Sequence, residues 1–228
     1  MRKSAKNTSF NFVPTDIVFN PDEKIFFNHE CVILDIETTG LDAINDKIIQ
    51  FGAVKYTSNK MIDSIEFFID PEIEIPEFIT NINHIKNEDV KGQIKIKEGL
   101  ERIKNFIGKN AFLIAHNGIN FDLNFINSKL KENNMELINQ PLLDTMWLSK
   151  AINPHFYKHS LANIVQEYAI DYDLSCAHQA LYDVNLLLQV WNVMKNQLKD
   201  YDVKSLNDLN KKFVKYLDKK IDYSKIHC

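Results

Sequence analysis

Two carboxylates stand one residue apart at the end of a short apolar segment. The segment reads Cys-Val-Ile-Leu-Asp-Ile-Glu over residues 31–37, and a Thr-Thr-Gly turn follows it. On a β-strand, Asp35 and Glu37 point to the same face. Burying two like charges together is costly, and a divalent cation with oxygen ligands removes that cost. At this point two interpretations are open: a metal site, or a strand end where one acid is solvated and the other caps the turn.

Two further acids lie in similarly informative positions. Asp122 follows a predicted strand and turn and begins a helix, where the helix dipole alone favours an acid. Asp183 lies within a mostly apolar helix, a place where a lone acid is rare without a partner. His178 stands five residues earlier, near the start of that helix; taken alone, it reads as a capping or core histidine. The four acids and the histidine together are far more specific than any one of them.

The three segments that carry these residues resemble the motifs of the DnaQ-like (DEDDh) exonucleases, which remove nucleotides from 3′ ends. Residues 35–40 resemble D-x-E-T-x-G, residues 116–122 resemble H-N-x-x-x-F-D, and residues 178–183 resemble H-x-A-x-x-D. The resemblance covers about 31–195. In its Thr-Thr-Gly-Leu form it is closest to the proofreading exonuclease of bacterial DNA polymerase III, either the separate subunit or the insert of the Gram-positive replicative polymerase.

The resemblance implies a role for each residue of the cluster. Asp35, Glu37, Asp122 and Asp183 would hold two Mg²⁺ or Mn²⁺ ions, with Asp35 bridging both. Glu37 and Asp183 would complete the site that binds the attacking water, and Asp122 would serve the second ion. His178 would be the general base, because an imidazole titrates near working pH.

The resemblance also implies residues that contact the substrate: Thr38, Thr39, Leu41, Asn83, Asn117 and Phe121. Phe121 either stacks on a base, as suits single strands, or packs on the helix face. Asn117 would position the backbone or orient the second motif. Family members often have T-G-I or H-G-I where this chain has Asn-His-Ile over 83–85. His84 therefore replaces a glycine, which leaves the shape of that loop and its recognition of a sugar open.

Apolar patterning predicts the elements that must position these residues. Strands fit 31–37, 47–56 and 61–70, a spacing that suggests a three-stranded meander, and a further strand fits 112–115. Helices fit 98–107, 121–131, 144–151, 160–169 and 178–198, with Ser160 as the N-cap of the fourth. The resemblance supplies the topology: an α/β, ribonuclease H-like fold with a mixed five-stranded sheet, its first three strands antiparallel, and helices on both faces.

Length and composition bound the organisation of the chain. Its 228 residues, 45% hydrophobic and 25% charged, suit one large domain or a domain with an appendage. We predict an N-terminal extension (1–30), an exonuclease domain (31–198) and a basic amphipathic helix (199–228). The last segment holds eight Lys and five Asp. It is either a solvated helix packed on the domain or a basic arm for a partner or a nucleic-acid backbone.

Composition also excludes several classes of protein. Three cysteines without a CxxC pair argue for a reducing compartment and against a thiolate zinc site. A net charge of −4 excludes a strongly basic coat. The sequence shows neither a secretory signal nor an apolar run long enough to cross a bilayer, which predicts a cytoplasmic protein with no membrane partner.

The predicted function is a metal-dependent 3′–5′ exonuclease that acts on single-stranded or frayed DNA in proofreading or repair and releases nucleoside 5′-monophosphates. A 3′–5′ exoribonuclease that trims RNA is the alternative, because the motifs do not separate the two sugars. Less favoured are an inactive module that binds nucleic acid or a polymerase, and a calcium site for stability. The predicted partners are single-stranded DNA 3′ ends and a DNA polymerase subunit.

Overall fold

The computed structural model describes residues 30–57, 60–109, 111–173, 177–203 and 208. The predicted N-terminal extension, except for residue 30, lies outside these ranges. So does most of the predicted C-terminal helix. Of that segment, 199–200 finish the last long helix and Val203 is buried.

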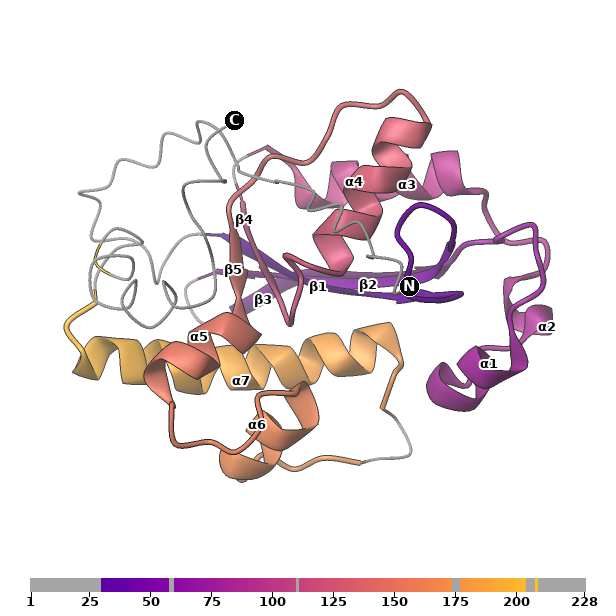
Figure 1. Cartoon of the computed structure of the whole chain (residues 1–228). Helices are drawn as coiled ribbons and strands as arrows, with labels where there is room; N and C mark the ends of the chain where they lie inside the picture. Colours follow the sequence, from indigo (N-terminus) through magenta and orange to yellow (C-terminus); the bar gives the residue numbers. More distant parts are fainter. Residues whose placement is uncertain (1–29, 58–59, 110, 174–176, 204–207, 209–228) are drawn as a thin grey trace, which may run out of the picture.

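A five-stranded sheet forms the centre of the molecule, with strand order β3-β2-β1-β4-β5 (Figure 1). β1 (Cys31–Thr38), β2 (Ile48–Thr57) and β3 (Lys60–Phe68) are antiparallel. β4 (Phe112–Ala115) pairs parallel with β1, and β5 (Leu142–Asp144) pairs parallel with β4. The mixed sheet with three antiparallel strands is therefore confirmed. β5 has only three residues and is not identified by apolar patterning.

Helices cover both faces of the sheet, as predicted (Figure 1). One face carries α3 and α4, and the other carries α7 with α5 and α6 beside it. Two short helices, α1 and α2, lie beyond one end of the sheet and are absent from the sequence prediction. The bounds are α1 (Glu77–Asn83), α2 (Asn87–Val90), α3 (Ile96–Ile107), α4 (Asp122–Glu132), α5 (Thr145–Ile152), α6 (Leu161–Glu167) and α7 (Ala180–Asp200).

The continuous apolar run of β1 follows from burial on both faces. Ile33 belongs to the hydrophobic core under α7, whereas Val32 and Leu34 belong to the core under α3 and α4. Because side chains alternate along a strand, Asp35 and Glu37 continue the row that faces α7. The two acids therefore stand where the apolar core on that face gives way to the end of the sheet.

Gly52 lets α7 cross the sheet at close range. It pairs with Asp35 across β1 and β2. A Cβ added at Gly52 would lie 2.7 Å from the backbone of Ala180 and Leu181. The first turn of α7 can rest on the sheet only because this residue has no side chain. That contact brings the N-terminal turn of α7, with Asp183, next to the acids of β1.

Two smaller features of the helices bear on the predictions. Ser160 does stand at the N-cap of α6, but its hydroxyl donates to Asn163 Oδ1 at 2.7 Å and makes no cap hydrogen bond to the helix backbone. Among the helices of the described ranges, none combines the length and the apolar character needed to cross a membrane.

Candidate active site

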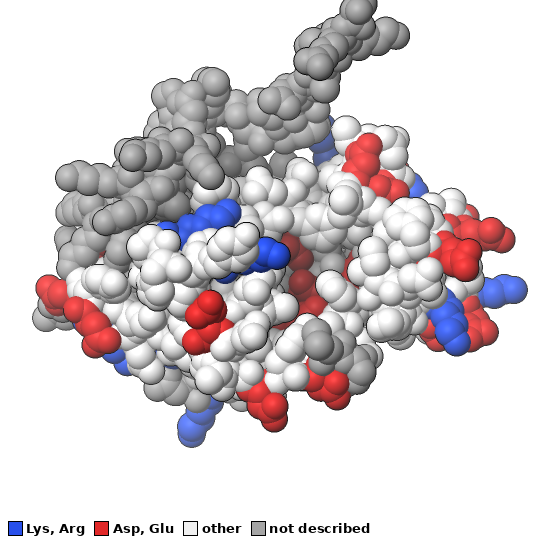
Figure 2. All heavy atoms as spheres, turned by 60° about the horizontal axis from the view of Figure 1, so that its bottom comes forward, with Lys and Arg blue, Asp and Glu red and all other residues white. Residues whose placement is uncertain are grey.

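A cleft of about 480 Å³ opens beside the end of β1. Asp35 and Glu37 line it from the strand, and His178 and Asp183 line it from the start of α7. In Figure 2 the molecule is hollowed on this face, with acidic atoms at the bottom of the hollow and Lys or Arg atoms at its rim. The fold thus gathers residues separated by nearly 150 positions into one concave site.

Asp122 reaches this site from the opposite side of β1. Its side chain is 1% exposed and lies at the N-terminus of α4. Its Oδ1 accepts a hydrogen bond from the backbone N–H of Ile36 at 3.1 Å. Ile36 lies between the two acids of β1, so the Asp122 carboxylate is buried at the edge of the strand beside them. It is not among the residues that line the cleft.

His178 and Asp183 are joined by a local hydrogen bond. The backbone N–H of His178 donates to Asp183 Oδ2 at 3.0 Å. His178 has a left-handed backbone, with φ of 62°, just before the N-cap residue Gln179. Ligand atoms of Glu37, His178 and Asp183 all lie within 4.8 Å of one another.

Burial and mutual repulsion raise the pKa of the clustered acids. Burial raises the pKa of Asp35 well above its usual range, and the charges of Asp122, Glu37 and Asp183 raise it further. Burial raises the pKa of Glu37 to about 8, despite a hydrogen bond from Asn83 that lowers it. Burial likewise raises the pKa of Asp122 to about 7 and raises that of Asp183. Without a cation, Glu37 and Asp122 therefore hold protons near neutral pH.

The donor set fits a hard divalent cation. Four carboxylates offer oxygen ligands, the kind that Mg²⁺ and Mn²⁺ prefer. In the described part of the chain, the ion pairs of Lys and Arg go to other carboxylates. The charge of the cluster is therefore left for a ligand to neutralise. Asp35 and Asp122 lie outside the group whose ligand atoms come within 4.8 Å of one another, so a cation shared by all four would draw these two inward.

Asn83 contacts the cluster directly. It is buried at the end of α1, and its Nδ2 donates to Glu37 Oε2 at 3.3 Å. Its Oδ1 accepts from the backbone N–H of Ile85 at 3.1 Å. His84 caps α1 with a left-handed backbone, φ 62° and ψ 6°. The histidine thus adopts the conformation for which glycine is favoured.

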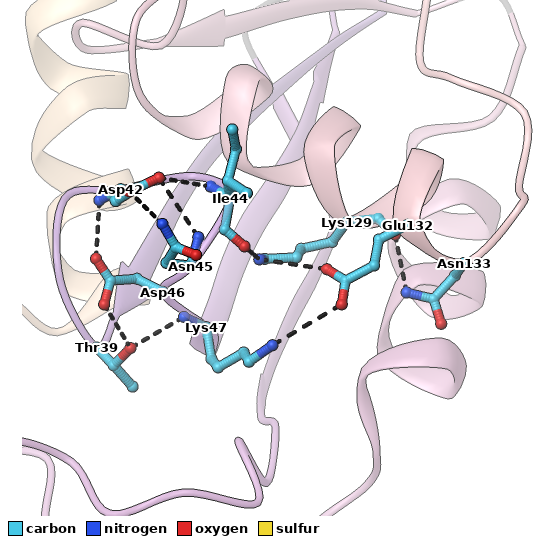
Figure 3. Close-up of polar contacts among 9 residues, drawn as sticks. All are labelled: Thr39, Asp42, Ile44, Asn45, Asp46, Lys47, Lys129, Glu132 and Asn133. Carbon is cyan, nitrogen blue, oxygen red and sulfur yellow. Dashed lines mark hydrogen bonds and ion pairs between the residues drawn. The ribbon is translucent and has the colours of Figure 1, made fainter.

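The end of β1 and the loop that follows it carry the next three predicted residues, of which Figure 3 shows Thr39. Thr38 lines the cleft, and its hydroxyl donates to the carbonyl of Gly40 at 2.6 Å. Thr39 is buried; its Oγ1 accepts from the backbone N–H of Lys47 at 2.9 Å and donates to Asp46 at 3.4 Å. Leu41 is 85% exposed and lines the cleft. The two hydroxyls shape the loop, and Leu41 is the side chain left to meet a ligand.

Phe121 and Asn117 occupy different environments. Phe121 lines the cleft and also packs on Phe125, with ring centroids 5.0 Å apart. It therefore both faces the cleft and packs on the helix. Asn117 is not a lining residue: its left-handed backbone has φ of 63°, and its side chain accepts a hydrogen bond from Asn120. The structure places it in the turn that leads to α4.

Asp144 is a buried acid that the sequence-based site prediction missed. One of its carboxylate oxygens accepts from the backbone of Asn117 at 3.1 Å and the other from Ile119 at 3.2 Å. The same side chain caps α5 by accepting from Met146 and Trp147. It thus fixes the turn that precedes Asp122. An Asp at a helix N-cap was a usable signal for the cap, but nothing local indicates its contact with a turn 25 residues away.

The rest of the cleft wall comes from residues that carry no chemical signature in the sequence. They include Ile79 and Ile82 from α1, Leu161 and Ala162 from α6, and Tyr172. His116 also lines the cleft, with its Nδ1 3.0 Å from Thr145 Oγ1. Burial lowers the pKa of His116 to about 4, so its imidazole is neutral near pH 7.

Sheet order, helices on both faces and a carboxylate cluster at the strand ends together define a nuclease with a ribonuclease H-like fold. The chain belongs to the exonuclease family: the RNase_T family model, described as "Exonuclease", matches residues 32–191. This confirms the resemblance drawn from the three motifs.

Two kinds of relatives support the same assignment. The chain is 43% identical over 198 residues to the DNA polymerase III PolC-type of Ureaplasma parvum and 39% identical over 194 residues to that of Mycoplasma genitalium. These matches cover 86% and 85% of this chain but only 14% and 13% of the relatives, so the chain spans about a seventh of their length. Among solved structures, Escherichia coli exonuclease I in complex with a dT13 oligonucleotide aligns with a TM-score of 0.67 at 16% identity. That alignment covers 76% of this chain and 42% of exonuclease I, and it shows a shared fold.

Proposed function

We propose that this exonuclease hydrolyses phosphodiester bonds at the 3′ end of single-stranded or frayed DNA, releases nucleoside 5′-monophosphates and depends on Mg²⁺ or Mn²⁺. The observation that carries the proposal is the convergence of Asp35, Glu37 and Asp183 with His178 in one cleft, with Asp122 buried at the edge of the strand that carries Asp35 and Glu37. Neither β1 nor α7 contains all of these groups, so the site exists only in the folded chain.

Asp35, Glu37, Asp122 and Asp183 are the residues that would hold two divalent cations. When bound, such cations lower the pKa of a coordinated water and stabilise charge on the scissile phosphate. The raised pKa values of the acids support this assignment, because a buried like-charged cluster gains most from a cation. Cations would also allow a polyanion to enter a cleft whose floor is acidic.

His178 is the general base in this proposal. It lies on an exposed turn at the cleft, within 4.8 Å of Glu37 and Asp183 ligand atoms. A side chain there can take a proton from a water held between the acids and pass it to solvent. Its backbone N–H, which donates to Asp183, orients the turn. Asn83 acts as a positioning residue in this proposal, because its amide donates a hydrogen bond to the carboxylate of Glu37.

The terminal nucleotide would lie between Leu41 and Phe121. Both side chains line the cleft, and both offer apolar surface to a base or sugar. Thr38 and Thr39 would act through the shape of the loop that holds Leu41, and Asn117 through the turn before Asp122. Contacts to a base face carry no sequence preference, which suits an enzyme that removes any terminal nucleotide.

Proofreading for a bacterial DNA polymerase, in the cytoplasm, is the proposed cellular role. The PolC-type relatives are named as DNA polymerases, and a structural neighbour is named as a complex with a DNA oligonucleotide. These names support DNA over RNA as the substrate and a polymerase subunit as the partner. RNA trimming is the alternative, and the experiment below tests it by comparing DNA and RNA strands of one sequence.

The test compares strands of one sequence made as DNA and as RNA, each labelled at the 5′ end, with Mg²⁺ and with EDTA. We expect the DNA to shorten stepwise from its 3′ end with Mg²⁺ alone and to yield mononucleotides. Asp35→Asn should lose this activity, and Asp63→Asn, at an exposed acid on β3, should keep it. Equal digestion by wild type and Asp35→Asn would overturn the proposal, and faster digestion of RNA would reassign the substrate.

A further inference from the structure

The loop between β1 and β2 places an exposed apolar side chain at the cleft. Leu41 is 85% exposed and lines the cleft together with Gly40. A single exposed leucine on a mobile loop would lose conformational entropy on contacting a ligand. The contacts that hold the loop in place therefore decide how well Leu41 can bind.

Inside the loop, one carboxylate organises the backbone (Figure 3). Asp46 Oδ2 accepts from the backbone N–H of Asp42 at 2.8 Å, and Asp46 Oδ1 accepts from Thr39 Oγ1 at 3.4 Å. The carboxylate lies directly under Gly40, where an added Cβ would come within 2.4 Å of it. Asp42 Oδ1 in turn accepts from the backbone N–H of Ile44 at 2.9 Å. These bonds close the loop on itself.

A buried lysine joins this loop to the rest of the molecule. Lys129 Nζ donates to the carbonyl of Ile44 at 2.9 Å, and the Lys129 side chain is only 1% exposed. Glu132 accepts from the same ammonium at 3.4 Å and pairs with Lys47, at the other end of the loop, at 3.9 Å. In Figure 3 the lysine reaches from α4 to the loop carbonyl.

The burial of the Lys129 ammonium lowers the stability of the folded state. Burying an ammonium group is unfavourable, and an apolar side chain of similar size is often as good or better for folding. Lys129 is on α4, the helix that begins with Asp122, so the same helix contacts the strand at one end and the loop near its other end. The ammonium therefore fixes the loop relative to the acids of the cleft.

We propose that Lys129 is a positioning residue for substrate binding: by holding the carbonyl of Ile44, it keeps the β1–β2 loop closed and Leu41 pre-organised against the terminal nucleotide. This inference rests on the proposed function for the identity of the ligand. The contact itself is a property of the loop, so it can be tested separately.

The first measurement is the double-mutant cycle of Lys129→Met and Leu41→Ala in the DNA exonuclease assay. Lys129→Met keeps the apolar stem and removes the ammonium. We expect it to raise KM about tenfold with kcat changed less than twofold, an effect on the scale of a misplaced binding group. Because Lys129 acts through Leu41, the double variant should show no larger KM than Leu41→Ala alone. Multiplicative effects, or an unchanged KM in Lys129→Met, would overturn the proposal.

The second measurement does not depend on activity. Amide hydrogen exchange of residues 39–47 should accelerate in Lys129→Met and stay at the wild-type rate in Lys131→Met, an exposed lysine on the same helix. If Lys129→Met folds poorly, Asp46→Ala is the alternative variant. It removes the carboxylate that organises the loop from inside, and it should raise both KM and the exchange rate of residues 39–47. Unchanged exchange in both Lys129→Met and Asp46→Ala would refute the proposal that these contacts hold the loop closed. If exchange is faster in Lys129→Met but the wild-type chain cleaves no DNA, the proposed function is refuted and the role of Lys129 in holding the loop still stands.

Discussion

The backbone N–H of Ile36 donates a hydrogen bond to Asp122 Oδ1 at 3.1 Å, across 86 positions of sequence. β4 pairs with β1 only at residues 31–33. Beyond that point β1 has no strand neighbour on this side, and the carboxylate of Asp122 takes the place of a strand carbonyl. One interaction thus satisfies a buried strand N–H and also brings a fourth acid to the site.

Asp122→Asn separates these two roles. The amide oxygen can still accept from Ile36, whereas the negative charge is gone. We expect DNA exonuclease activity to fall by about two orders of magnitude or more, the scale seen when a charge-stabilising group is lost. Thermal unfolding in EDTA at pH 8 should occur at the same or a higher temperature, because repulsion with Asp35 is relieved. Asp122→Ala is the matched comparison and should lose about 1–3 kcal/mol through the unsatisfied N–H. Wild-type activity in Asp122→Asn would contradict the metal assignment.

The stability of the cation-free protein should fall as pH rises. Burial raises the pKa of Glu37 from 4.5 to about 8 and that of Asp122 from 3.8 to about 7. Between the usual pKa and the raised pKa of each group, the folded state binds more protons than the unfolded state, so the free energy of unfolding decreases as pH rises. The loss should run from about pH 4 to about pH 8. Urea unfolding in EDTA at several pH values measures it, and Glu37→Gln should flatten the profile.

The same linkage predicts that stabilisation by Mn²⁺ grows with pH. Cation binding requires deprotonated carboxylates, so it releases protons from the raised-pKa acids. We expect the shift in melting temperature on adding Mn²⁺ to be small at pH 5.5 and large at pH 8. Asp63→Asn is the control and should behave as wild type. A shift independent of pH would show that the cation binds away from these acids.

The sequence was sufficient for β1 and the identity of its acids. An uninterrupted branched apolar run is what burial on both faces demands, and the period of two assigns Asp35 and Glu37 to one face. A site residue that the sequence did not predict is held by contacts between distant segments. Asp144 looks like an ordinary N-cap, and its bonds to the turn before α4 arise only after β4 and β5 pair.

The shortest helix and the shortest strand were not predicted, for a different reason. β5 and α2 have three and four residues, too few for a period to show. Asn83 was expected to contact the substrate, and the structure places its amide on Glu37. The replacement of glycine by His84 left the shape of that loop open, and the structure gives His84 the left-handed conformation that glycine favours. A backbone dihedral of this kind depends on the cap of α1, which no local pattern indicated.

Asp144→Ala should destabilise the protein more than loss of an ordinary cap. The carboxylate accepts from four backbone N–H groups in two segments and is 4% exposed. Its removal leaves buried donors unsatisfied, for which we expect a loss of about 2–4 kcal/mol in urea unfolding. Asp144→Asn keeps one acceptor and should lose less. A change below the usual scale for a surface substitution, about 0.5 kcal/mol, would contradict this account.

Gly52→Ala tests how closely α7 must approach the sheet. The new methyl group would meet the backbone of Ala180 and Leu181 at 2.7 Å, closer than packed atoms allow. Backbone cannot rotate away, so we expect α7 to shift outward at a cost of about 1–3 kcal/mol. Asp183 lies in the first turn of this helix and moves with it. Exonuclease activity should therefore fall even at temperatures where the variant is fully folded, as followed by circular dichroism. Ser64→Ala, on the exposed edge strand β3, is the matched control and should change neither stability nor activity. A folded Gly52→Ala variant with wild-type activity would mean that the site tolerates displacement of α7.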